Sequence, residues 1–119
     1  MKKVFQTKFG FPDGNCHAAC IASLFEVDID DIPSWGNRSD WYDKFTKWCV
    51  SNLGVQPIDI DADTCFIEPI GHYIINGESK NGDFWHSVIG YGGKVVHDPH
   101  PDSALKNQKT FTFFIKIAQ

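Results

Sequence analysis

Residues 12–25 read PDGNCHAACIASLF, in which a turn sequence runs directly into an apolar segment. Asn15 can cap a helix there by accepting a hydrogen bond from an unpaired backbone N–H. The residues after Cys16 are apolar on most sides of a helix, which is typical of a buried helix. We therefore predict a buried helix that begins at Asn15 or Cys16 and ends at Phe25.

The rest of the chain predicts one more helix and then strands. The second helix is expected from Asp40 to Leu53, with Ser39 as a candidate cap and Gly54 as its stop. After Gly54 the hydrophobic period changes to two, as in strands. The expected strand segments are 57–61, 71–77, 84–91, 94–99 and 111–118, and the last should have one face in the core. Helices followed by antiparallel strands predict an α+β fold in one domain, 1–119.

The composition and the charge of the chain limit its partners. It has 119 residues, a hydrophobic content of 42% and a formal net charge of −4, and its lysines and arginine form no run. No nucleic-acid partner is expected, because a phosphate backbone is bound by basic patches. No stretch approaches the roughly 18 apolar residues of a membrane span, so no membrane partner is expected. We expect no cofactor, because no Gly-rich loop precedes a helix. The sequence does not indicate an oligomeric state.

The cysteines favour a reducing compartment. They show no CxxC pair, and residues 1–10 lack the apolar stretch of a secretory signal. Reduced thiols in a cytoplasm are therefore expected. No metal site is expected, because neither HDPH (97–100) nor the Cys16/Cys20 pair has the spacing of a structural zinc site.

Cys16 is a candidate nucleophile because of its place in the first helix. A free thiol has a pKa of about 8.5, and a helix N-terminus or a neighbouring imidazolium lowers this value. The unpaired N–H groups and the positive dipole end of the helix favour a thiolate at such a position. The alternative is that Cys16 is a small buried apolar residue, which is the preferred interpretation of Cys20 one turn further on.

A nucleophilic cysteine needs a base, and His86 in FWHSVIGY is the candidate. Asp98, in VVHDP on the next strand, can orient the ring as in a catalytic triad. If the loop consists of Gly92-Gly93 alone, Asp98 points to the face of the sheet opposite to His86. His97 is then the rival candidate for the third member of the triad. A loop that begins one residue earlier pairs His86 with Asp98. Turn statistics favour the shorter loop, and the sequence leaves the choice open.

The stretches GNCHAACIASLF (14–25) and HSVIGYGGKVVHDP (86–99) resemble the papain-like cysteine peptidase superfamily, especially its small bacterial and phage members similar to the bacteriocin-leader peptidases. The resemblance implies a minimal papain-like α+β fold, in which an N-terminal nucleophile helix packs on an antiparallel sheet. It implies Cys16 as nucleophile, His86 as base and Asp98 as orienting residue. It also implies a protein or peptide substrate and a cytoplasmic location in a bacterium or an infected host cell.

The oxyanion donor departs from the family pattern. The family usually has a glutamine a few residues before the cysteine, whereas Gln6 stands ten residues before Cys16. The expected donors are therefore Gln6, Asn15 or a backbone N–H of the first helical turn. The DGNC stretch is separately similar to the nucleophile turn of ovarian-tumour-type deubiquitinases.

The function expected from these residues is that of a cysteine-dependent hydrolase or acyltransferase. Such an enzyme attacks an amide or isopeptide bond and passes through a thioester. The triad does not distinguish a peptidase from a deamidase or a transacylase, because the pocket selects the leaving group and the acceptor. The alternative is a catalytically silent papain-like binding module for a protein or a small ligand.

Overall fold

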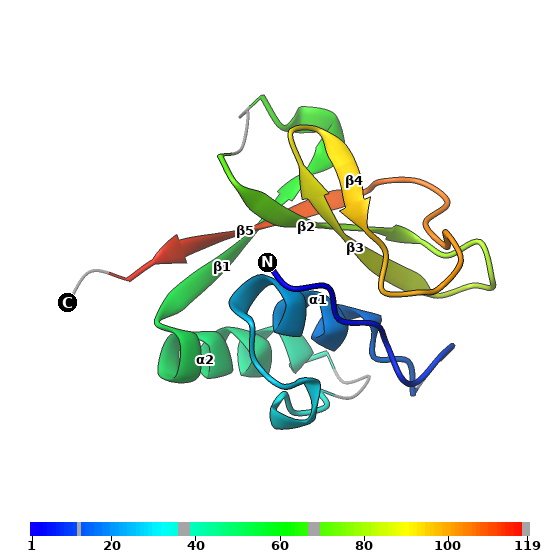
Figure 1. Cartoon of the computed structure of the whole chain (residues 1–119). Helices are drawn as coiled ribbons and strands as arrows, with labels where there is room; N and C mark the ends of the chain where they lie inside the picture. Colours follow the sequence, from blue (N-terminus) through cyan, green and yellow to red (C-terminus); the bar gives the residue numbers. More distant parts are fainter. Residues whose placement is uncertain (12, 36–38, 67–69, 118–119) are drawn as a thin grey trace.

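The computed structural model describes residues 1–11, 13–35, 39–66 and 70–117, and in these ranges it shows two α-helices on one side of a five-stranded sheet (Figure 1). The helices are α1 (Cys16–Phe25) and α2 (Trp41–Leu53). The strands are β1 (Val55–Asp61), β2 (His72–Glu78), β3 (Trp85–Tyr91), β4 (Lys94–His97) and β5 (Thr110–Lys116). They pair antiparallel in the order β1-β5-β2-β3-β4, which confirms the α+β prediction.

Helix α1 begins at Cys16, within the predicted bounds, but its cap differs from the prediction. Asn15 occupies the N-cap position, and its side chain makes no capping hydrogen bond. The Asn15 carboxamide instead binds the N-terminal segment at Thr7 and Lys8. The helix ends at Phe25, because the next residue has a left-handed φ of 54°.

Helix α2 begins one residue later than predicted and ends where predicted. Its N-cap is Asp40 rather than Ser39. Gly54 ends it with a φ of 66°, a conformation that glycine adopts without the strain of a side chain. Phe45 and Cys49, four positions apart, are fully buried and give this helix its core-facing side. Within the described ranges, neither helix combines the length and hydropathy that crossing a bilayer requires.

Both faces of the sheet have apolar cover, because neighbours along a strand point to opposite faces. Ile74 and Ile89 lie in the larger cluster, together with buried residues of α1 and α2. The residues next to them along the strands form a second cluster, which consists of Tyr73, Ile75 and Val88 with Leu105, Phe111 and Phe113 packed against it. The expectation of one core face for β5 is therefore wrong, because Phe114 packs on the larger cluster and Phe113 on the smaller one.

The hairpin of β3 and β4 has the two-residue loop that turn statistics favour. The loop residues Gly92 and Gly93 have φ values of 61° and 80°, as the tight hairpin turn requires. The strands continue in that register only as far as the pair Gly90 and Val95.

A β-bulge then changes the register of the hairpin. Ile89 pairs with His97, which leaves Val96 as one extra residue on β4. An extra residue moves every side chain beyond it to the other face. Asp98 therefore lies on the side of His86 although the loop is short. Each loop alternative is therefore right in one respect. The alternative with the Gly92-Gly93 loop predicts the correct loop length, and the alternative with the longer loop predicts the correct face for Asp98.

Candidate active site

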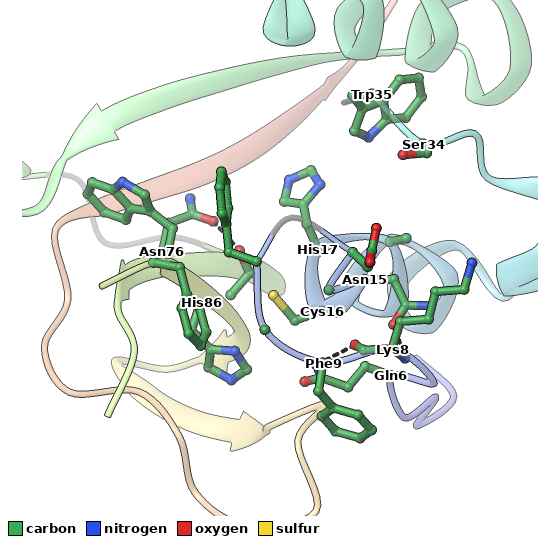
Figure 2. Close-up of a pocket in the computed structure, with 18 of the residues that line it drawn as sticks. Gln6, Lys8, Phe9, Asn15, Cys16, His17, Ser34, Trp35, Asn76 and His86 are labelled. Atoms are coloured by element: carbon green, nitrogen blue, oxygen red, sulfur yellow. Dashed lines mark hydrogen bonds between the residues drawn. The ribbon is translucent and has the colours of Figure 1, made fainter. Parts of the chain in front are cut away.

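Cys16 and His86 meet at one cleft. Cys16 stands at the first position of α1, where backbone N–H groups lack intrahelical acceptors, and it is partly exposed. His86 comes from the beginning of β3 and is only 3% exposed. The Cys16 thiol interacts with the His86 ring, and both residues line the same cleft (Figure 2).

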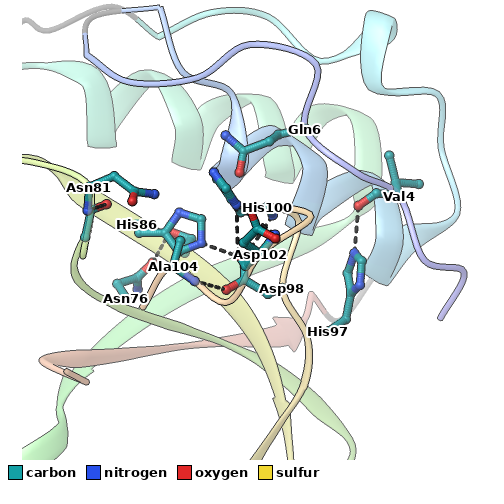
Figure 3. A network of polar contacts seen from close by, with 12 residues as sticks. Val4, Gln6, Asn76, Asn81, His86, His97, Asp98, His100, Asp102 and Ala104 are labelled. Atoms are coloured by element: carbon teal, nitrogen blue, oxygen red, sulfur yellow. Dashed lines mark hydrogen bonds and ion pairs between the residues drawn. The ribbon is translucent and has the colours of Figure 1, made fainter. Parts of the chain in front are cut away.

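Asp98 holds the other side of the His86 ring. The His86 Nε2–H donates to Asp98 Oδ1 over 2.6 Å, so Nδ1 is the ring nitrogen left to face Cys16 (Figure 3). The same carboxylate accepts the backbone N–H groups of His100 and Ala104, each at 2.9 Å. Three donors therefore keep the carboxylate in a single orientation.

The electrostatics of the three residues favour an imidazolium. Burial lowers the pKa of His86, but the hydrogen bond to Asp98 and the interactions with Cys16 more than offset this and raise the pKa to about 9. Burial raises the pKa of Asp98, but the hydrogen bonds from His86, Ala104 and His100 leave it below its usual value. At neutral pH the ring is thus protonated beside an ionised carboxylate, which suits a thiolate partner.

Gln6 reaches the site from a segment that crosses beside the first helix. Its backbone N–H donates to Pro99 O at 3.0 Å, and the residue is 8% exposed. One hydrogen of Nε2 is donated to Lys8 O at 3.0 Å, and Oε1 is buried without a partner in the described part of the chain. Figure 2 shows the carboxamide extending toward the space between Cys16 and His86. Since an amide nitrogen has two hydrogens, one N–H is left for a ligand.

Asn15 positions this segment and is not directed at the reacting atoms. Its Oδ1 accepts the backbone N–H groups of Thr7 and Lys8 at 3.0 and 2.9 Å. Its Nδ2 donates to Thr7 Oγ1 at 2.9 Å. The side chain that was expected at the oxyanion therefore holds the loop that carries Gln6.

His97 and Cys20 serve the packing around the site. The His97 Nε2–H donates to Val4 O at 2.7 Å, and the ring lies edge-on to Phe5. His97 thus anchors the N-terminal segment, while Asp98 takes the position beside His86. Cys20 is fully buried, and burial raises the pKa of its thiol well above the usual range.

The cleft extends well beyond the three central residues. It has a volume of about 1200 Å³, and its lining includes two side chains of α2 and several polar side chains of the sheet. Sequence reasoning missed Asp59, Asn76 and Thr112 on its floor, because single polar residues in strands are ordinary on a solvated face. The period-two pattern was the only available signal, since it places them on the side of the sheet that bears the helices.

Comparisons with protein-family models, with curated proteins and with solved structures found no match to this chain. The resemblance to papain-like peptidases therefore stays a prediction from the sequence. The geometry of the site is the basis for the function that follows.

Proposed function

We propose that this chain is a cysteine-dependent hydrolase or acyltransferase of minimal papain-like architecture, which acts on an amide or isopeptide bond of a protein or peptide. The observation that carries the proposal is the row of Cys16, His86 and Asp98, with the 2.6 Å contact between ring and carboxylate at its centre. A helix-opening cysteine, a buried histidine and a fixed acid are the parts that nucleophilic catalysis needs.

The reaction divides into two steps. The Cys16 thiolate attacks the carbonyl carbon and forms a C–S bond, and the tetrahedral anion then expels the amine as the His86 imidazolium gives it a proton. The product is a thioester and neutral His86. Neutral His86 next takes a proton from water, the resulting hydroxide attacks the thioester, and the C–S bond breaks to release the acid. An amine in place of water gives acyl transfer instead.

The oxyanion has two sources of hydrogen bonds near Cys16. The backbone N–H groups of the first turn of α1 have no intrahelical acceptors, and the remaining Nε2 hydrogen of Gln6 is close to the same space. Preorganised donors of this kind stabilise the anion because they need no rearrangement as charge develops.

A catalytically silent binding module is the second candidate. It is favoured by one observation, which is that the side chains of Gln6 and Asn15 already bind Lys8 and Thr7. If the backbone donors alone do not stabilise the oxyanion, the same cleft binds a ligand without turning it over.

Alkylation of the native chain distinguishes the two candidates. Iodoacetamide at pH 7, followed by peptide mapping, should label Cys16 at least about tenfold faster than Cys65. Cys65 is the matched internal control, because both cysteines are partly exposed and neither is in a disulfide. His86→Ala should slow the labelling of Cys16, and Cys16→Ser should keep the circular dichroism spectrum while it removes any hydrolysis of a peptide library. Equal and slow labelling of Cys16 and Cys65 would contradict the enzyme and leave the binding module.

A further inference from the structure

The cleft floor carries a continuous row of polar side chains, one from each of four neighbouring strands. Ser87 Oγ donates to Asn76 Oδ1 at 2.7 Å, and Asn76 Nδ2 donates to Thr112 Oγ1 at 2.9 Å. Thr112 Oγ1 then donates to Asp59 Oδ1 at 2.6 Å. We call these four residues the polar row. It runs from β3, beside His86, across β2 and β5 to β1.

Every hydrogen bond between members of the polar row is oriented toward Asp59. Each side chain donates to the next one, so the carboxylate of Asp59 is the final acceptor. Tyr42 of α2 also binds this carboxylate, and burial together with the negative charge of Asp59 raises the pKa of Tyr42 to about 12. The phenol is therefore neutral and donates. These contacts fix the carboxylate at the floor of the cleft, while the residue stays accessible to solvent.

The negative charge of Asp59 has no cationic partner among the described residues. Partial burial raises the pKa of Asp59 in spite of the hydrogen bonds from Thr112 and Tyr42. A carboxylate that is paired with a cation has a lowered pKa. The charge at this end of the cleft is thus uncompensated.

The rest of the cleft lining also favours a cation. Carboxylates outnumber ammonium groups, since Asp13, Asp30 and Asp83 line the cleft with Asp59, and Lys8 is the one lysine there among the described residues. His17 contributes no positive charge at neutral pH, because burial lowers its pKa to about 4. Aromatic side chains also line the cleft, among them Trp35, Trp41 and Tyr42, and aromatic rings attract cations.

Unpartnered buried atoms in the same cleft point to a peptide ligand. Gln6, more than nine-tenths buried, lines the cleft and leaves its Oε1 unpaired, and His17 Nδ1 and Trp35 Nε1 also have no partner in the described part of the chain. Buried polar atoms are normally hydrogen-bonded, so these atoms are suited to a ligand with both donors and acceptors. A peptide backbone supplies both kinds of group.

We propose that the Asp59 end of the cleft is a specificity subsite for a lysine or arginine side chain of the peptide that Cys16 attacks. Three strand intervals separate β3 from β1, which is about 14 Å at the usual strand spacing. An extended peptide advances about 3.4 Å per residue, and the long stem of a lysine covers part of the distance. The basic residue therefore lies roughly two or three positions from the attacked bond.

The test measures binding, so it does not depend on turnover, although the inference rests on the proposed function. The probes are capped, fluorescein-labelled octapeptides of alanine in which one residue is replaced by lysine, arginine, norleucine or glutamate. Each replacement is made at every position in turn. The Kd of each peptide for the full chain is measured by fluorescence anisotropy. We expect the lysine or arginine peptide to bind about tenfold more tightly than its norleucine counterpart at one position, and glutamate to bind most weakly. The preference should decrease as salt increases.

Two variants complete the test. Asp59→Asn keeps an acceptor for Thr112 and should reduce the lysine preference to within twofold. Asp63→Asn removes the same charge from an exposed residue outside the cleft and should leave the preference unchanged. Equal binding of lysine and norleucine peptides, or a preference that survives Asp59→Asn, overturns the subsite. Iodoacetamide labelling of Cys16 tests the enzyme separately, so a lysine preference without fast labelling supports the subsite in a binding module.

Discussion

Two histidines should give the stability of this protein a maximum near pH 6.5, because their pKa values move in opposite directions on folding. His17, packed against the rings of Phe45 and Trp41, has its pKa lowered from 6.5 to about 4 by burial. His86 has its pKa raised to about 9, since the contacts with Asp98 and Cys16 outweigh the effect of burial. His17 therefore resists protonation in the folded state, and His86 retains its proton there.

The signs follow from proton linkage. Between pH 4 and 6.5 the unfolded chain binds a proton at His17 that the folded chain does not bind, so stability increases with pH. Between pH 6.5 and 9 the folded chain retains a proton at His86 that the unfolded chain releases, so stability decreases with pH. One pKa unit corresponds to about 1.36 kcal/mol. The protonation of His17 should therefore lower the free energy of unfolding by about 2 kcal/mol between pH 7 and pH 5. The deprotonation of His86 should lower it by about 2 kcal/mol between pH 6.5 and pH 8.5.

Urea unfolding followed by tryptophan fluorescence at half-unit steps from pH 5 to 8.5 measures the curve. His86→Gln should flatten the alkaline side and keep the acidic side, and His17→Gln should do the reverse. His72→Gln is the matched control, because that histidine lies on the exposed end of β2 outside the cleft. The reasoning is refuted if the wild-type free energy of unfolding varies by less than about 0.5 kcal/mol over this range. It is also refuted if His86→Gln keeps the alkaline decline.

Two further changes test the packing around the site. Asn15→Ala removes three hydrogen bonds to the N-terminal segment. It should reduce the free energy of unfolding by about 1 to 2 kcal/mol and speed the amide hydrogen exchange of Lys8. The control Asn52→Ala, on the exposed side of α2, should do neither. Unchanged exchange at Lys8 would show that Asn15 does not hold the segment. Phe45→Ala empties a fully buried position and should destabilise the fold by about 3 to 5 kcal/mol in urea unfolding, while Phe45→Leu should cost clearly less. A loss below 1 kcal/mol for Phe45→Ala would argue against a tightly packed core there.

Much of the local structure follows from short stretches of sequence. The apolar run after Cys16 predicts α1, Gly54 predicts the end of α2, and Gly92-Gly93 predicts the tight turn between β3 and β4. These features depend on neighbours within a few residues, through helix periodicity and glycine's access to positive φ. Such signals are present in the chain before any long-range contact forms.

The roles of Asn15 and Gln6 could not be settled in this way. Asn15 has the chemistry of a helix cap, but two backbone N–H groups of the N-terminal segment compete for its oxygen and bind it instead. Gln6 lies ten residues from Cys16 in the chain and reaches the cleft because Pro99 and His97 anchor the segment around it. Both placements depend on contacts between distant parts of the chain.

The sequence by itself determined the candidate residues for the proposed chemistry, namely a cysteine at a helix start, a histidine in a strand and an acid in the next strand. Only the tertiary structure decided that they meet. The bulge at Val96 combines a two-residue turn with the placement of Asp98 beside His86. The physical reason is that a hairpin register is chosen by the packing of both faces of the sheet, where His97 binds Val4 and Asp98 binds three donors, and no local pattern contains that information.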